Sequence, residues 1–312
     1  RLMAVPGSWN EQYDDLFGYL DLAWYVKKVH VPSCWQGQRV FIRVGSAVYL
    51  GTVYLNGEKI GSHEGGHLPF AFEITGKIKW GEENVIAISV ENVLKPERVP
   101  SGNMPGSDMS MFMATPKTTY DFYPFSGIHR PVVLYSVPQT YIEDVTVVTT
   151  IEPEAQVKVT VKLNATVDGK GSVQLTDGKT NVRADLTFAA GAAEAVLTVQ
   201  NARLWSDKDP YLYDLTVTGA GDSYSLKAGI RTIAVDGPHI MLNGKPVKLN
   251  GYGRHEDFPA TAKALNLPLI VKDYQLMKWT GANAYRTSHY PYSEEEMQVA
   301  DREGMLIIDE IP

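Results

Sequence analysis

The sequence predicts a multidomain chain in which two all-β regions precede a region of alternating strands and helices. Two observations lead to this prediction. Short segments rich in β-branched and aromatic residues, separated by turn residues, fill the chain up to about residue 235. Beyond that point the pattern becomes strand, polar loop, helix and apolar strand, which is typical of a βαβ unit with parallel strands. The length of 312 residues is sufficient for two or three domains.

The composition is that of an ordinary globular protein and excludes several classes of partner. Hydrophobic residues make up 44% of the chain, the net charge is −7 and no basic run occurs, so we expect no nucleic acid as a partner. No segment approaches the roughly 20 apolar residues of a membrane-spanning helix, so we expect no membrane either. The only cysteine, Cys34, cannot form an internal disulfide, and its VPSCWQG context indicates a turn rather than a catalytic thiol. We expect neither a metal nor another cofactor.

Residues 1–139 are predicted to form a jelly roll. The strands are expected near residues 24–26, 39–44, 52–55 and 85–90. The Asn56-Gly57 pair predicts a hairpin, because a type I′ turn needs positive φ at both central positions. Between residues 93 and 119, prolines and glycines without periodicity indicate a long loop. Its four methionines are interpreted as packing residues, with an adaptable apolar surface as the alternative.

Residues 140–234 are predicted to form an immunoglobulin-like β-sandwich. Alternating strands are expected near residues 145–148, 156–161, 195–199 and 212–217, with Asp-Gly turn signals between them. The region has no concentrated set of titratable residues. We therefore interpret it as a spacer that orients its neighbours.

Residues 235–312 are predicted to begin a (β/α)8 barrel. Strands are expected near residues 247–250, 283–288 and 305–309, with a polar loop over 252–257, and helices over 269–279 and 293–303. The carboxyl ends of such strands are where barrels place their active sites. Three strands cannot close a barrel, so we expect the remainder of the polypeptide to be supplied elsewhere.

Two motifs in this third region carry a family resemblance. NAYRTSHYP at 283–291, followed by a helix, Asp301-x-x-Gly304 and four apolar residues, resembles a signature of glycoside hydrolase family 2. VPGSWN at 5–10 and DFYPFSGIHRPVVLY at 121–135 extend the likeness over nearly the whole chain. Glu296 departs from the signature, which has an apolar residue there, and we interpret it as a tolerated change on the helix surface. GYGRHED at 251–257 and SHYPYSEE resemble the branch of the family that hydrolyses β-glucuronides.

The resemblance implies a retaining glycosidase that releases β-D-glucuronic acid from glucuronide conjugates. Such enzymes use two glutamates from later barrel strands, the first in an Asn-Glu pair, and no Asn-Glu pair of this chain has that context. Glu256, Asp309 and Glu310 lie near strand ends, but the resemblance argues against them. We therefore assign no catalytic acid or nucleophile here and predict that the 312-residue chain alone is inactive.

Four residues are expected in the sugar-binding part of the site by this resemblance. His289 would contact sugar hydroxyls and stabilise the transition state, although a lone histidine is more often structural. Asp121 would reach from the jelly roll to the sugar, and its alternative is the aspartate of a turn. His255 matches a histidine that lines the site in β-galactosidase relatives. Arg286 would support the nucleophile through hydrogen bonds, or be a buried ion-pair partner.

Other functions stay open at this stage. β-Galactosidase and β-galacturonidase belong to the same family, and the motif that recognises the glucuronide carboxylate falls outside these residues. The non-enzyme alternative is a carbohydrate-binding fragment, with Trp9, Trp24 or Trp35 stacking on sugar faces unless they are core residues. We expect a cytoplasmic location and a homo-oligomer, although the chain begins at Arg1 and its amino-terminal context is not visible.

Overall fold

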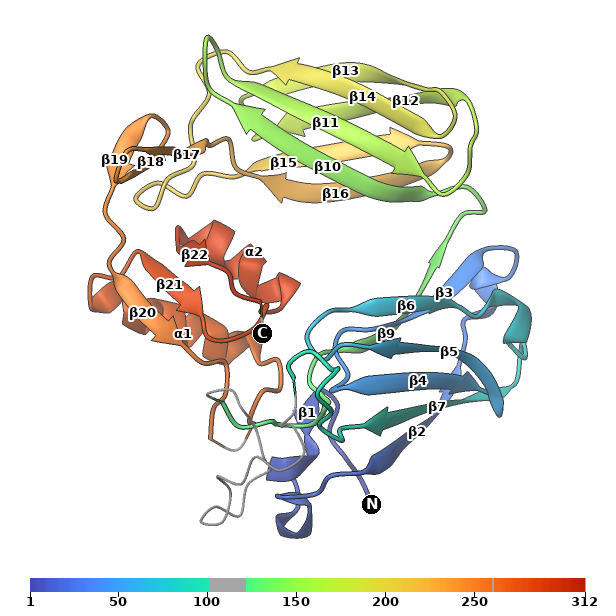
Figure 1. The fold of residues 1–312 in the computed structure, drawn as a ribbon. Coiled ribbons are helices and arrows are strands. Elements are labelled where there is room, and N and C mark those ends of the chain that lie inside the picture. Colours follow the sequence, from blue (N-terminus) through green and yellow to red (C-terminus); the bar gives the residue numbers. More distant parts are fainter. Residues whose placement is uncertain (102–121, 260, 312) are drawn as a thin grey trace.

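Two β-sandwiches and a small parallel sheet with two helices make up the structure, a computed structural model that describes residues 1–101, 122–259 and 261–311. Figure 1 shows the first sandwich in blue and green, the second in green and yellow, and the helical part in orange and red, below the second sandwich and to the left of the first. The predicted multidomain fold class is confirmed. No helix in the described part of the chain is long and apolar enough to cross a membrane.

The first sandwich packs a four-stranded sheet, in the order β2-β7-β4-β5, against a three-stranded sheet, in the order β6-β3-β9. Alternate residues point into a shared core. Val40, Ile42 and Val44 of β3 and Ile86, Ile88 and Val90 of β7 are buried there. The strands are β1 (Gly7–Ser8), β2 (Leu22–His30), β3 (Arg39–Val44), β4 (Leu50–Leu55), β5 (Glu58–Glu64), β6 (Phe70–Glu73), β7 (Glu83–Glu91), β8 (Gly127–Ile128) and β9 (Val132–Val137).

Local signals in this sandwich are confirmed where they can be observed. Asn56 and Gly57 have φ of 54° and 87° and join β4 to β5, as the type I′ prediction requires. Cys34 is exposed within a 3-10 turn, Ser33–Trp35. Residues 102–119 of the predicted long loop, with its four methionines, lie outside the described residues.

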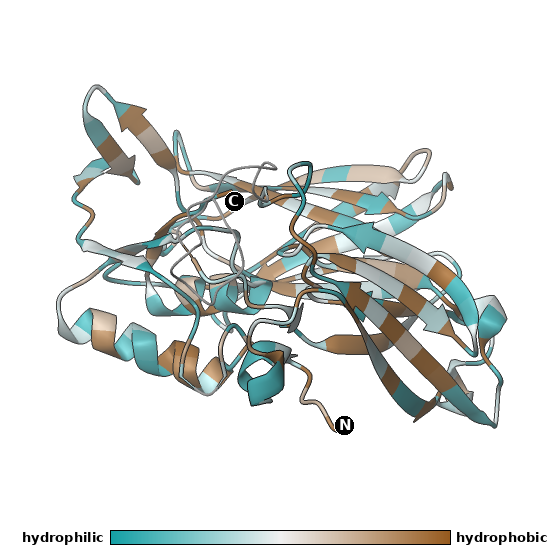
Figure 2. Ribbon diagram, turned by 60° about the horizontal axis from the view of Figure 1, so that its bottom comes forward, coloured by the Kyte–Doolittle hydropathy of each residue, from teal (hydrophilic) through white to brown (hydrophobic). Residues whose placement is uncertain are grey.

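The second sandwich packs the sheet β10-β11-β14 against the sheet β13-β12-β15-β16. Its core consists largely of Val, Leu and Phe side chains from alternate strand positions, and the bands of brown and teal along the strands in Figure 2 reflect this alternation. Residues 140–230 contain no helix, as predicted. The strands are β10 (Ile142–Thr150), β11 (Gln156–Leu163), β12 (Gly169–Thr176), β13 (Asn181–Phe188), β14 (Ala192–Thr198), β15 (Tyr213–Gly219) and β16 (Asp222–Ala228).

A three-stranded antiparallel sheet connects the second sandwich to the helical part. It contains β17 (Ile233–Asp236), β18 (His239–Leu242) and β19 (Lys245–Val247). Beyond it, β20 (Gly251–Arg254), β21 (Ala284–Thr287) and β22 (Leu306–Ile308) pair in parallel, with α1 (Leu267–Trp279) and α2 (Glu294–Glu303) as the crossovers. Helix residues such as Tyr274 and Val299 share a buried cluster with Tyr285 of β21.

Both helices have the ends that the sequence indicates. The Asn266 side chain accepts a hydrogen bond from the amide of Leu269 at the start of α1. The Ser293 hydroxyl accepts one from the amide of Glu296 at the start of α2, and Gly304 ends that helix with φ of 76°. Three glutamates in the first turn of α2 also complement the helix dipole.

The position predicted for the first barrel strand is wrong. Residues 245–247 belong to the hairpin, and the parallel strand is Gly251–Arg254, which we had expected to begin a polar loop. Glycine is depleted in strands, which is why the pattern favoured residues 247–250. At Gly251 the two strands approach so closely that a Cβ would lie 1.8 Å from the carbonyl oxygen of Ala284. The pairing of β20 with β21 therefore requires a residue without a side chain at position 251.

Replacing Gly251 with alanine should destabilise the chain, because the new methyl group would overlap the backbone of β21. We expect a loss of about 3 kcal/mol in the free energy of unfolding, measured by denaturant titration. Gly169→Ala is the matched control, since a Cβ there would meet no atom within 4 Å. Equal losses in the two variants would contradict the steric explanation.

Candidate active site

Polar side chains gather at the carboxyl ends of β21 and β22. The Nδ1 atom of His289 lies 3.3 Å from Nη2 of Arg286 and 3.3 Å from Oε2 of Glu310. Arg286 and Glu310 themselves form an ion pair. The ring of His255, which follows β20, lies edge-on to the ring of His289 with centroids 5.3 Å apart. The structure therefore brings together three of the four residues that the sequence suggested, and Asp121 lies outside the described residues.

Glu310 is the member of this cluster that sequence reasoning did not place. It was considered only as a catalytic carboxylate, whereas here it contacts both Arg286 and His289. The signal that was available is its position two residues after Ile308, the last residue of β22, beside the end of β21. Neighbouring parallel strands place their end residues side by side.

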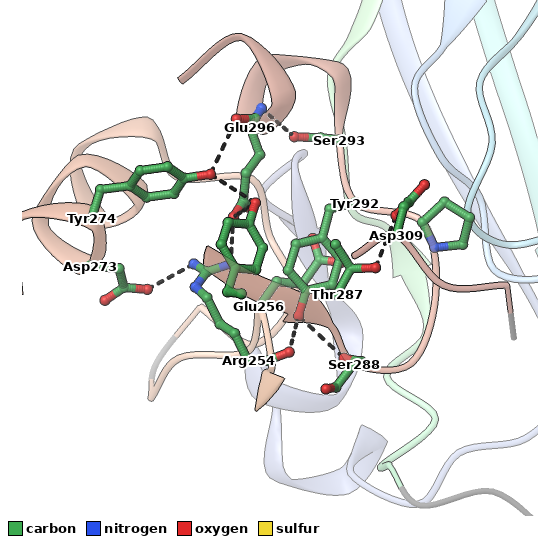
Figure 3. Close-up of polar contacts among 12 residues, drawn as sticks. Arg254, Glu256, Asp273, Tyr274, Thr287, Ser288, Tyr292, Ser293, Glu296 and Asp309 are labelled. Carbon is green, nitrogen blue, oxygen red and sulfur yellow. Dashed lines mark hydrogen bonds and ion pairs between the residues drawn. The ribbon is translucent and has the colours of Figure 1, made fainter. Parts of the chain in front are cut away.

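Thr287 joins the ends of the two strands that carry the cluster. Its side chain is fully buried and donates a hydrogen bond to Oδ1 of Asp309 at 2.9 Å. The same hydroxyl accepts one from the backbone amide of Glu310 at 2.9 Å. Figure 3 shows Thr287 and Asp309 facing each other across the strand ends. These two bonds fix the backbone from which the Glu310 carboxylate projects.

An aromatic layer from the first sandwich lies beside the cluster. The ring of Phe122, the residue after Asp121 in the sequence, stacks on the ring of His289 with centroids 6.4 Å apart. It also meets the fully buried ring of Tyr290 edge-on at 5.1 Å. The ring of His67 also stacks on the ring of Tyr290, with centroids 4.5 Å apart. The first sandwich thus forms one border of the site.

The interpretation of Glu296 as a helix-surface residue is wrong. Its side chain is 1% exposed, and its carboxylate accepts a hydrogen bond from Nη1 of Arg254 at 2.6 Å and one from the hydroxyl of Tyr285 at 3.2 Å. Arg254 also pairs with Asp273 of α1 at 2.7 Å, as Figure 3 shows. A buried arginine in β20, rather than the local helix pattern, thus accounts for an acidic residue at this position.

Burial raises the pKa of Glu296 to about 7, because removal of water disfavours the carboxylate more than Arg254 and Tyr285 stabilise it. The pKa of the folded state exceeds the usual value of 4.5, so the folded state retains the proton that the unfolded state has lost. The resulting stability is present below about pH 4.5 and is lost as the pH rises to about 7.

Glu296→Gln should remove this part of the pH dependence, since glutamine does not titrate. Between pH 5 and 7.5, the free energy of unfolding of the unmodified chain should fall relative to the variant by up to about 3 kcal/mol. Urea titrations at both pH values measure the difference. Glu295→Gln, one residue earlier and less buried, is the control. A constant difference between chain and Glu296→Gln across this range would refute the explanation.

Two cavities of the described residues are lined by side chains outside this cluster. One of about 670 Å³ is lined by Asn250 and Asn283, which precede β20 and β21, together with Asp207 and Lys248. Another, of about 370 Å³, is lined mainly by apolar residues around β22 and the hairpin, such as Leu249 and Ile308. Barrels place chemistry at the opposite ends of their strands. Among the described residues, no group of three or more His, Cys, Asp or Glu residues is arranged to hold a metal ion.

Comparison with known proteins extends over the whole chain. Residues 1–138 match the sugar-binding domain of glycosyl hydrolases family 2, residues 140–231 match glycosyl hydrolases family 2, and residues 233–312 match the TIM barrel domain of that family. The β-glucuronidases of Felis catus and Paenibacillus borealis are 37% and 36% identical over 99% of the chain. The chain spans about half the length of these relatives, 51% and 53% respectively.

Solved structures of β-glucuronidases are also similar to this chain over its whole length. A β-D-glucuronidase from Dictyoglomus thermophilum superposes with a TM-score of 0.88 at 37% identity, over 100% of this chain and 55% of that one. A β-glucuronidase from Ruminococcus gnavus in complex with D-glucuronic acid superposes with a TM-score of 0.88 at 33% identity, over 99% of this chain and 54% of that one.

Proposed function

The chain belongs to glycosyl hydrolase family 2, and on that premise we propose that it forms part of a retaining β-glucuronidase. The chain holds the sugar-binding domain, the immunoglobulin-like domain and the beginning of the TIM barrel of this family. The observation that carries the proposal is the cluster of His289, Arg286 and Glu310 at the strand ends, bordered by Phe122 of the first sandwich. Relatives at about twice the length bear the name β-glucuronidase, and one is solved with D-glucuronic acid.

Each proposed site residue has a role that its surroundings support. His289 binds sugar hydroxyls through its ring, which Arg286 and Glu310 hold in place. Arg286, which pairs with Glu310 at the same strand ends, is proposed to donate a hydrogen bond to the nucleophile carboxylate. His255, beside His289, borders the same space. Asp121 reaches the sugar from the first sandwich, and the contact of its neighbour Phe122 with His289 supports this role.

The catalytic pair is proposed to come from further barrel strands of a longer polypeptide. A retaining enzyme needs two carboxylic acids about 5–5.5 Å apart, one as acid/base and one as nucleophile. Glu310 is engaged by Arg286 and His289, and Asp309 by Thr287. Both contacts favour structural roles for these carboxylates. Domain boundaries after residues 139 and 234 are also proposed, supported by family matches that end at 138 and 231.

Two alternatives are kept because specific observations bear on them. A β-galactosidase or β-galacturonidase is the first alternative, because both belong to the family whose domains match this chain. The carbohydrate-binding fragment depends on exposed aromatic rings. Trp9 is 1% exposed and Trp35 packs against the core, so Trp24 is the remaining candidate of the three. Trp24 is 53% exposed, and its ring lies tilted against that of Tyr54 with centroids 5.2 Å apart.

The full-length enzyme should cleave p-nitrophenyl β-D-glucuronide with retention at the anomeric carbon, and the 312-residue chain alone should not. Accelerations of ~10⁶ or more require the acid and the nucleophile together. In the full-length enzyme, His289→Ala should lower kcat/KM by ~10²-fold or more, because contacts to the sugar tighten in the transition state.

His239→Ala, which removes an exposed histidine of β18, is the control and should leave kcat/KM within about twofold. Robust turnover by the isolated chain would make Glu256, Asp309 or Glu310 catalytic and overturn the role assignment. Cleavage of the β-galactoside alone would leave the family membership intact and overturn the substrate.

A further inference from the structure

We propose that Arg130 is a positioning residue that holds the His289 loop against the first sandwich and thereby sets the geometry of the sugar site. The proposal rests on the proposed function, because it concerns the same site. Arg130 lies between β8 and β9 and is 6% exposed. The loop in question is 289–292, which connects β21 to α2.

The guanidinium of Arg130 bridges two domains through backbone acceptors. Its Nη1 donates to the carbonyl of His67 at 2.6 Å, within the first sandwich. Its Nη2 donates to the carbonyl of Pro291 at 2.9 Å, two residues after His289. Because the guanidinium is a rigid planar fork, these two bonds fix the Pro291 carbonyl relative to the sandwich. A lysine ammonium carries its three donors on one nitrogen and lacks this planar fork, so it cannot reproduce the geometry of the two bonds.

The aromatic layer transmits this constraint to His289. The Tyr290 ring, between His289 and Pro291 in sequence, is clamped by the parallel ring of His67 at 4.5 Å. The ammonium of Lys263 lies 3.5 Å from the centroid of the same ring. Phe122 contacts both Tyr290 and His289. A shift of the loop would therefore move the His289 ring within its polar cluster.

Charge also favours Arg130 at this boundary. Its Nη2 lies 4.0 Å from Oε2 of Glu256, whose side chain is 12% exposed. Burial raises the pKa of Glu256, and the cations Arg130, Lys263 and Arg254 oppose that rise. Removing Arg130 would leave this carboxylate with less compensation as well as releasing the loop. The interaction is therefore part of the packing between the domains rather than a surface ion pair.

A second arginine provides a matched comparison. Arg43 of β3 also reaches from the first sandwich to the helical part and pairs with Glu294 of α2 at 2.6 Å. Its side chain is 29% exposed and that of Glu294 is 63% exposed, so solvent screens this pair and its contribution to stability is small. In the described structure, the hydrogen bond and ion pair of Arg43 go to Glu294 of α2 and not to the 289–292 loop. Arg43→Gln thus removes a cationic link between the domains without releasing the His289 loop.

The test is a double-mutant cycle in the full-length enzyme, run on whichever p-nitrophenyl β-glycoside the wild type cleaves. Arg130→Gln and Arg130→Lys should each lower kcat/KM by ~10–100-fold, mostly through kcat. The reason is that displacing a site residue by about 1 Å reduces the rate by a factor of this order. Arg43→Gln should stay within about twofold. In a His289→Ala background, Arg130→Gln should lower kcat/KM by less than about threefold, because its effect passes through His289.

Assays are made well below the melting temperature of each variant, with circular dichroism confirming the fold. Equal losses with and without His289, or a kcat/KM of Arg130→Gln within about threefold of wild type, would overturn the proposal. Failure of both Arg130 variants to fold would assign this residue to stability and overturn it too. A wild type active on another β-glycoside would refute the glucuronide substrate while leaving the cycle interpretable.

Discussion

The parallel pairing of β20, β21 and β22 is the constraint on which the candidate site depends. In this pairing Arg254 lies beside Thr287 in register, and Arg286 beside Ile308, so the residues that follow all three strands meet at one edge of the sheet. His255, His289 and Glu310 come from sequence positions far apart, yet each follows directly on one of these strands. The close approach at Gly251 permits the first of the pairings. The site is thus a consequence of strand direction and register more than of any single side chain.

Local patterns were sufficient to predict most elements and the position of His289. The Asn56-Gly57 turn and the serine cap and glycine end of α2 depend on the conformational preferences of a few adjacent residues, and the sequence displays those directly. The first barrel strand was misplaced because Gly251 is explained only by its close contact with Ala284 of β21, about thirty residues later in the chain. Sequence periodicity carries no information about such contacts.

Glu296 illustrates the same limit for charge. The pattern of apolar residues in α2 does not indicate whether an acidic side chain faces water or a buried arginine. Arg254, the partner of Glu296, lies 42 positions away in sequence. A buried carboxylate needs compensating donors, and here Arg254 and Tyr285 supply them. Arg254 at the same time contacts Asp273 of α1, so one guanidinium connects β20 to both helices. Glu310 escaped prediction for a related reason, because its partners Arg286 and His289 belong to a different strand end.

In the proposed function, the polar cluster forms one wall of the sugar site rather than a complete catalytic apparatus. The described carboxylate nearest to His289 in the cluster, that of Glu310, is paired with Arg286 and also contacts His289. A retaining mechanism requires a second wall that presents two less constrained carboxylic acids across the sugar. The first sandwich borders the cluster through Phe122, which contacts His289, and through His67, which contacts Tyr290. Beyond β22, Ile308 is 52% exposed and borders an apolar cavity of about 370 Å³, which is the direction in which further strands of a barrel would pair.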